Sequence, residues 1–264
     1  MATVKEVFEK LDTWAPFETQ MSFDNAGLLV GRGGREVQSV LVALDVTLPV
    51  VEEAERLGCS LIVAHHPVIF EPVRRMTEDD PTGAVLLALA EKGIAAICAH
   101  TNLDACQGGV NDCLAQRLEL RGAELLEQDG VDRAGRPYGI GRVGMAHQEC
   151  GAGEYAAYVK EKLGAASVRF VDAGKPVRRV AVGGGSCGSM LMEAVEAGCD
   201  TFVTSDVKYN VFLDAKALGL NLMDAGHYAT ENVVCPAVTD FLKGEFPELK
   251  ICIAEHHPEV YQEA

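Results

Sequence analysis

Residues 42–66 of the chain read VALDVTLPVVEEAERLGCSLIVAHH, and residues 182–206 read VGGGSCGSMLMEAVEAGCDTFVTSD. The two stretches align without a gap at a shift of 140 residues, from 42 to 182. Identical residues recur in pairs: Glu53 and Glu193, Ala54 and Ala194, Gly58 and Gly198, and Cys59 and Cys199. In each stretch, two short apolar runs flank a segment whose apolar residues recur with the periodicity of a helix. This pattern is typical of a βαβ unit. The repeat therefore predicts two related α/β halves.

The same alternation extends outside the repeat. Strand-like runs occur at 39–44, 60–64 and 94–99, and helix-like segments at 48–57, 83–92 and 108–119. This order is typical of mostly parallel sheets covered by helices. A less regular stretch, 121–175, has Gly- and Arg-rich turns. The sequence predicts a first α/β half at 1–120, a connecting segment at 121–175 and a second α/β half at 176–264.

Composition excludes several classes of protein. The chain has 264 residues, with 23 Lys and Arg against 39 Asp and Glu, a formal net charge of −16. General nucleic-acid binding is not expected, because phosphate contacts need clustered positive charge. Apolar runs are too short for a membrane span, and the N-terminus lacks the apolar core of a signal peptide. Nine scattered cysteines without a CxxC motif favour buried thiols over a disulfide scaffold. We expect a cytoplasmic protein with no membrane partner.

Four of the histidines follow apolar runs. His65 and His66 come directly after LIVA, His100 after AICA, and His227 after LMDAG. Ligand sites in open α/β sheets lie beyond the carboxyl ends of the strands. Pro67 favours a turn that brings the two neighbouring imidazoles to one site, since adjacent side chains on a strand point to opposite faces. We therefore expect these imidazoles to converge.

Two of these histidines are followed by a carboxylate at the same spacing. The pair His100 and Asp104 recurs as His227 and Glu231, four residues apart in each case. Four imidazoles and two carboxylates exceed the three protein ligands typical of one catalytic zinc and suit two bridged divalent ions. Unrelated core or surface histidines are the alternative, which the recurrence at equivalent strand ends disfavours. The two halves are thus expected to face a shared metal-site crevice.

Other polar residues near the predicted strand ends are weaker candidates. Three could position a ligand or contact substrate: Asp206, Lys208 and Tyr209. The glycines at 183–185 could cradle a phosphate, but a tight turn is the favoured interpretation. Asp45 and Thr47, at the start of the equivalent turn in the first half, are interpreted as a helix cap. The segment Glu255–His257 is interpreted as a mobile polar end rather than a metal site.

Six blocks of the chain carry a resemblance to a known family. They are FDNAGLLVG (23–31), VALDVTLPVVEEA (42–54), LIVAHHPVIF (61–70), AHTNLDA (99–105), TSDVKYN (204–210) and DAGHYATE (224–231). In content and order these blocks resemble the Nif-three-like dinuclear metal-centre family, often labelled GTP cyclohydrolase I type II homologues. The lack of a long insertion resembles the family's short members. Phe23 stands where the family often has Trp, and Asn210 where many members have His.

The resemblance implies a two-metal site with one bridging carboxylate. Its ligands here would be His65, His66, His100, Asp104, His227 and Glu231. It implies two divalent ions per chain, Zn, Fe or Mn, and assembly of a two-domain α/β unit into a homohexamer, a trimer of dimers. Such ions would activate water and polarise a phosphoryl, carbonyl or C=N group. The first hypothesis is a metal-dependent hydrolase acting on a nucleotide or another small anion. The alternative is a non-enzymatic metal-binding, metal-delivery or interaction protein.

Overall fold

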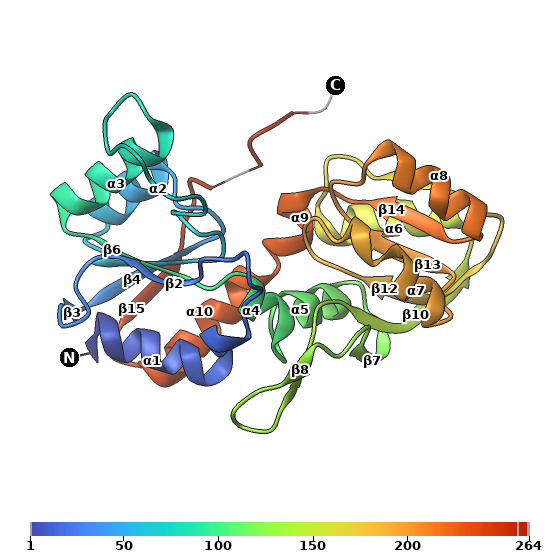
Figure 1. Cartoon of the computed structure of the whole chain (residues 1–264), viewed down its shortest axis with the longest axis horizontal. Helices are drawn as coiled ribbons and strands as arrows, with labels where there is room; N and C mark the ends of the chain where they lie inside the picture. Colours follow the sequence, from blue (N-terminus) through green and yellow to red (C-terminus); the bar gives the residue numbers. More distant parts are fainter. Residues whose placement is uncertain (1, 258, 263–264) are drawn as a thin grey trace. The chain divides into compact units, whose positions relative to one another are not determined.

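The chain forms two compact α/β units (Figure 1). The computed structural model describes residues 2–257 and 259–262. Unit 1 runs from the N-terminus to Leu103 and resumes at Cys235. Unit 2 runs from Asp104 to Val234 and includes the described residues from Glu259 onward.

Unit 1 is built on a five-stranded sheet with the order β15-β4-β5-β6-β2. The four parallel strands are β15 (Lys250–Ile253), β4 (Ser39–Ala43), β5 (Leu61–Ala64) and β6 (Ala95–Cys98), and β2 (Gly27–Val30) is antiparallel at the edge. Every residue of β4, β5 and β6 is buried. Continuous apolar runs of this kind are what a strand covered on both faces requires.

Helices cover this sheet and connect its strands. They are α1 (Val4–Trp14), α2 (Leu48–Arg56), α3 (Pro81–Lys92), α4 (Thr101–Ala105), which continues into unit 2, and α10 (Val234–Glu245). At the start of α3, Asp80 accepts the N–H of Gly83 at 2.7 Å, and Gly93 ends the helix with a φ of 62°. Short elements complete the unit: β1 (Ala2–Thr3), η1 (Phe17–Thr19) and β3 (Glu36–Val37).

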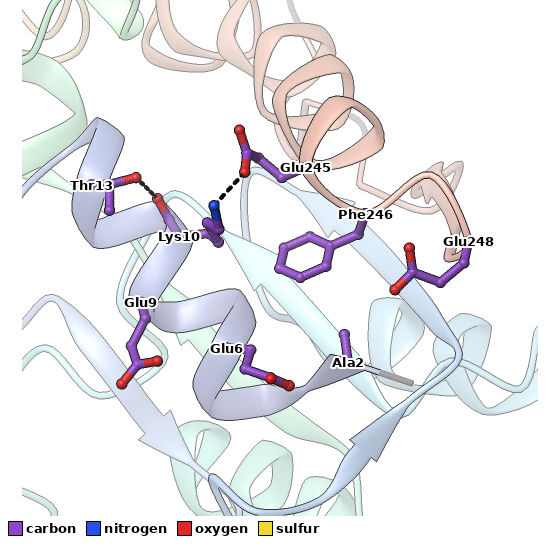
Figure 2. Close-up of a pocket in the computed structure, with 8 residues that line it drawn as sticks. All are labelled: Ala2, Glu6, Glu9, Lys10, Thr13, Glu245, Phe246 and Glu248. Carbon is purple, nitrogen blue, oxygen red and sulfur yellow. Dashed lines mark hydrogen bonds and ion pairs between the residues drawn. The ribbon is translucent and has the colours of Figure 1, made fainter.

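Helices α1 and α10 pack against each other at the edge of unit 1. Lys10 forms an ion pair with Glu245 at 2.8 Å (Figure 2), and the rings of Trp14 and Phe241 stack with centroids 4.6 Å apart. The chain returns to unit 1 at Cys235, in α10, and then forms β15, which pairs with β4. The C-terminal part of the chain therefore completes the sheet that the N-terminal part begins.

Unit 2 is built on a six-stranded sheet with the order β11-β14-β13-β12-β10-β7. The strands are β11 (Arg169–Val171), β14 (Asn221–Asp224), β13 (Thr201–Thr204), β12 (Val177–Val182), β10 (Arg142–Cys150) and β7 (Arg121–Leu125). The pairs β12–β13 and β13–β14 are parallel, and the outer pairs are antiparallel. Its helices are α5 (Val110–Arg117), α6 (Ala152–Leu163), α7 (Leu191–Glu196), α8 (Tyr209–Leu218) and α9 (His227–Glu231). A small hairpin pairs β8 (Gly130–Val131) with β9 (Pro137–Tyr138), and the 3₁₀ turn η2 (Gly188–Met190) precedes α7.

The predicted α/β fold class with two related halves is confirmed. The sheet of unit 1 is mostly parallel as predicted, whereas the sheet of unit 2 is mixed, with its parallel strands β12, β13 and β14 next to antiparallel neighbours. The first copy of the sequence repeat forms β4-α2-β5 and the second forms β12-α7-β13, with parallel strand pairing in both copies. The unit boundaries differ from the predicted 1–120, 121–175 and 176–264. Strand β15 pairs with β4 and therefore belongs to unit 1, because the edge of β4 needs a hydrogen-bonding partner. The stretch 121–175 supplies three strands of the unit 2 sheet and is not a separate connector.

Two expectations from composition can be compared with the structure. No helix in residues 2–257 and 259–262 is long and apolar enough to cross a bilayer. The nine cysteines all lie within these residues and are thiols in the structure, not disulfides.

The segment 255–257 is anchored, so its interpretation as a mobile end is wrong. Glu53, buried in α2, accepts the backbone N–H groups of Glu255 at 3.0 Å and His256 at 3.0 Å. His257 is also buried, and its Nδ1 accepts the N–H of Leu44 at 3.1 Å. Burial opposes ionisation of Glu53, but these hydrogen bonds hold its pKa below the usual value. The sequence did not reveal this because the partners lie about two hundred residues apart.

Glu53→Ala is expected to lower the free energy of unfolding by about 2 kcal/mol, because the N–H donors of residues 255 and 256 lose a charged acceptor. Glu52→Ala is the matched control, since Glu52 is exposed on the same helix. Urea denaturation of both variants gives the comparison. Equal stability of the two variants would show that Glu53 does not anchor the segment.

Candidate metal centre

Three histidines of unit 1 converge at the carboxyl ends of neighbouring strands. His65 and His66 follow β5, and His100 follows β6. The ring centroid of His65 lies 5.1 Å from that of His66 and 5.2 Å from that of His100, and the centroids of His66 and His100 are 5.7 Å apart. One potential ligand nitrogen from each ring lies within 4.8 Å of the other two. The predicted convergence is therefore observed for these three residues.

Each of the three rings is oriented through its Nδ1 atom. The Nδ1 of His65 contacts the carbonyl oxygen of Ala99 at 2.8 Å. His66 contacts Asp45 Oδ1 at 2.7 Å, and His100 contacts Asp24 Oδ1 at 2.8 Å. A carbonyl or carboxylate oxygen only accepts, so Nδ1 carries the proton in each ring and Nε2 of the neutral ring keeps its lone pair. Orientation of this kind is the usual supporting arrangement for histidines that bind a metal.

Asp24 holds His100 in place, a role that was not predicted from the sequence. Its Oδ1 accepts from His100, while its Oδ2 accepts from the Thr101 N–H at 3.0 Å and the Thr101 hydroxyl at 2.5 Å. Burial opposes ionisation, yet these hydrogen bonds lower the pKa of Asp24 to about 2. Only its place in the block FDNAGLLVG marked the residue, because Asp24 and His100 are 76 positions apart.

Asp45 has a different role from the helix cap that was expected. Thr47 is the N-cap residue of α2, and Asp45 lies two residues earlier, in the turn after β4. From that turn its carboxylate accepts from His66, which follows the adjacent strand β5. The interpretation as a cap was wrong for Asp45, because strand pairing brings His66 within its reach, while Thr47 takes the N-cap position.

In unit 2, helix α9 carries the second pair of candidate ligands. His227 Nε2 lies 2.9 Å from Glu231 Oε2, one helical turn later, and Glu231 is buried. Asp206, in the left-handed region with a φ of 51°, contacts His227 Nδ1 at 2.6 Å. Asp206 therefore orients His227 as Asp24 orients His100. Lys208 and Tyr209 are exposed at the start of α8.

The glycine loop at 183–185 serves packing rather than anion binding. The N–H of Gly184 donates to Asn111 Oδ1 at 2.9 Å, and the N–H of Gly185 donates to Thr230 Oγ1 at 3.0 Å. Both donors are thus used inside the protein, as the tight-turn interpretation requires. A Cβ atom on Gly185 would overlap Glu231 Oε1. The glycine allows the loop to approach this carboxylate.

Asp104 is buried in α4 and lies near the same loop of unit 2. Its carbonyl accepts from Asn111 Nδ2 at 3.0 Å, and Asn111 in turn accepts from the glycine loop. The thiol of Cys187 has a raised pKa through burial, with further contributions from the charges of Asp104 and Glu231. The charges of both candidate carboxylates thus act on the same half-buried thiol.

A pocket between α1 and the end of α10 has none of these properties. Figure 2 shows its lining: Ala2, Glu6, Glu9, Lys10, Thr13, Glu245, Phe246 and Glu248. Lys10 is the cation among these lining residues, and it is paired with Glu245. The remaining carboxylates would repel an anionic ligand, so the pocket does not compete with the histidine cluster as a site for an anion.

These features define a class: a two-unit α/β protein with histidines oriented by carboxylates at its strand ends. The model of the Duf34/NIF3 (NGG1p interacting factor 3) family matches residues 2–259. The chain therefore belongs to this family.

Relatives and solved structures agree with the assignment. The chain is 31% identical to a GTP cyclohydrolase 1 type 2 homolog of Clostridium perfringens, covering 91% of each chain. It is 37% identical to a protein of the same name from Streptomyces coelicolor, covering 88% of this chain and 82% of the relative. The crystal structure of a Staphylococcus aureus hypothetical protein superimposes with a TM-score of 0.92 at 30% identity, covering 99% of each chain.

Proposed function

We propose that this protein binds two divalent ions and acts as a metal-dependent hydrolase on a nucleotide or another small anionic substrate. The proposed ligands are His65, His66 and His100 in unit 1, and Asp104, His227 and Glu231 in unit 2. The observation that carries the proposal is the orientation of all four imidazoles through Nδ1, by a carbonyl or a carboxylate. His256 Nδ1 also contacts a carboxylate, that of Glu53 at 3.1 Å, so the orientation supports the proposal in combination with the convergence of the unit 1 histidines.

The donor set fits borderline divalent ions such as Zn, Fe or Mn, because it combines imidazole nitrogen with carboxylate oxygen. When bound, the ions would lower the pKa of a water molecule and polarise a phosphoryl, carbonyl or C=N group. Asp45 and Asp24 keep the Nε2 lone pairs of His66 and His100 available by holding the Nδ1 protons. Asp206 orients His227 in the same way, but the Nε2 of that ring faces Glu231 Oε2 at 2.9 Å.

The burial of the unit 1 cluster favours a reactive site over a closed structural one. His65 is only 2% exposed, whereas the side chains of His66 and His100 are 21% and 17% exposed. Structural metal sites are fully enclosed by protein ligands, and catalytic sites keep a position that solvent or substrate reaches. The names of the curated relatives, which refer to GTP cyclohydrolase, support a nucleotide as the first substrate class to test.

Metal analysis followed by activity assays tests the proposal. Purified protein is expected to hold two divalent ions per chain and to hydrolyse at least one member of a panel of nucleotides and phosphoesters. Removal of the ions should abolish turnover, and their return should restore it. His100→Ala should lose metal, whereas His147→Ala should not, because His147 stacks on Tyr158 with centroids 4.3 Å apart. Metal-replete protein without turnover on this panel would favour the alternative, a metal-binding or metal-delivery protein.

We also propose that the chain assembles in the cytoplasm as a homohexamer, a trimer of dimers. Exposed apolar side chains on the helices of unit 2 support self-association: Tyr209, Leu213 and Met192 are 78%, 54% and 47% exposed. Analytical ultracentrifugation is the test, and a monomer would contradict the proposal.

A further inference from the structure

Two exposed phenylalanine rings lie beside the histidine cluster of unit 1. The ring of Phe70 meets that of His100 edge to face, with centroids 6.0 Å apart and planes at 88°. Phe23 meets Phe70 in the same way, at 6.4 Å and 70°. The two rings therefore continue outward from the imidazole cluster as a row of aromatic side chains.

The backbone on each side of Phe23 is held by hydrogen bonds. The N–H of Met21 donates to Thr101 Oγ1 at 2.9 Å, and Asp24 accepts from His100 and Thr101. Asn25 Nδ2 donates to the carbonyl oxygen of Ile69 at 2.6 Å, which ties this loop to the residue before Phe70. The loops that carry both rings are thus connected to each other and to the residues that hold His100.

The rings themselves remain in solvent despite this anchoring. Phe23 is 63% exposed and Phe70 is 47% exposed. Full burial of a Phe side chain is worth about 1.5–3 kcal/mol relative to exposure, so leaving two rings exposed in anchored loops forgoes stability. A ligand that contacts the two rings would cover them, which explains why the loops hold them in an exposed position.

We infer that Phe23 and Phe70 form a stacking platform for the planar heteroaromatic ring of an anionic ligand that reaches the metal centre. This inference rests on the proposed function and names the part of the substrate that the metal ligands do not contact. Aromatic side chains stack against the flat face of a nucleobase ring. A simple phosphoester or a sugar without a base has no such aromatic ring.

The anionic group of the ligand is expected to contact the proposed metal ions, because the loop that follows Phe70 is not basic overall. Arg74 and Arg75 are exposed and follow Phe70 by four and five residues. The same loop also exposes Glu71, Glu78, Asp79 and Asp80, so its negative charges outnumber its positive ones and the loop does not by itself attract an anion. A purine nucleotide combines a ring that the phenylalanines can contact with phosphate groups that the proposed ions would bind, and is therefore the chemical class that fits the platform and the metal centre.

Calorimetric titration of the metal-loaded protein tests the platform. The probes are the β,γ-imido analogue of GTP, which resists hydrolysis, and inorganic tripolyphosphate, which has no ring. Wild-type protein is expected to bind the analogue about 10-fold more tightly than tripolyphosphate, in keeping with the effect of one stacked base. In a variant with Phe23→Leu and Phe70→Leu this preference should disappear, while metal content and tripolyphosphate affinity stay unchanged.

Two control variants separate stacking from other effects. Phe170→Leu removes a ring of unit 2 that is 43% exposed, and it should keep the preference. A variant with Arg74→Gln and Arg75→Gln should also keep the preference, since it removes charge from the loop but no aromatic ring. Absence of a preference in metal-replete wild type, including failure to bind either probe, would overturn the inference, as would a preference that survives in the leucine variant. A preference without turnover on any substrate would contradict the hydrolase proposal and leave the platform supported.

Discussion

Asp24→Asn is expected to lower the affinity of the chain for a divalent ion by about 10- to 100-fold, the range measured when a carboxylate behind a metal-binding histidine is lost. In the native chain Oδ1 faces the Nδ1 of His100 and Oδ2 faces two donors of Thr101. An amide has only one accepting oxygen, so its NH2 group would face at least one of these donors. Either His100 loses its orientation or the 20–26 loop loses its contact with Thr101.

Competition with a metal-sensitive dye measures this affinity. Asp132→Asn is the matched control, because Asp132 also accepts two backbone N–H groups, from Ala134 and Arg136, but lies in the β8–β9 hairpin. The control should bind metal as wild type does. Unchanged affinity in Asp24→Asn, with the fold intact by circular dichroism, would exclude Asp24 as the group that orients His100.

Gly185→Ala is expected to lower the free energy of unfolding by about 3 kcal/mol and to reduce metal binding by unit 2. The added Cβ would overlap Glu231 Oε1 and lie 3.4 Å from His227 Cε1. Glu231 is buried, so its carboxylate cannot move aside into solvent. The backbone φ of 64° adds strain for any residue with a Cβ atom.

Gly164→Ala separates the strain from the overlap. Gly164 has a φ of 65°, and a Cβ atom there would meet no other atom within 4 Å. This variant should lose only about 1 kcal/mol, since it carries the left-handed strain alone. Denaturation and metal analysis of the two alanine variants give the comparison. If they behave alike, the glycine loop does not determine the position of Glu231.

Local patterns in the sequence were sufficient to predict much of the architecture. Buried parallel strands need continuous apolar runs, and the helices between them need a periodic apolar face. The runs SVLVA, LIVA and AAIC could therefore be predicted as strands, and they form β4, β5 and β6. The same reasoning placed His65, His66 and His100 at one sheet edge, because parallel neighbours end on the same side. The repeat added that His227 and Glu231 belong to a related arrangement in the second half.

Partners distant in the chain could not be predicted in this way. Nothing local to Asp24, Asp45 or Asp206 states which histidine each one faces, since the choice depends on how strands and loops pair. Strand β15 joined unit 1 because the free edge of β4 accepts a parallel partner from the other end of the chain. In the same way, Glu53 anchors a segment about two hundred positions away. The sequence by itself thus determined the types of elements and the candidate metal ligands, which follow from local periodicity and ligand chemistry. The tertiary structure decided which carboxylate orients which imidazole and which exposed rings lie beside them, because those contacts exist only after distant backbone segments have satisfied each other's hydrogen bonds.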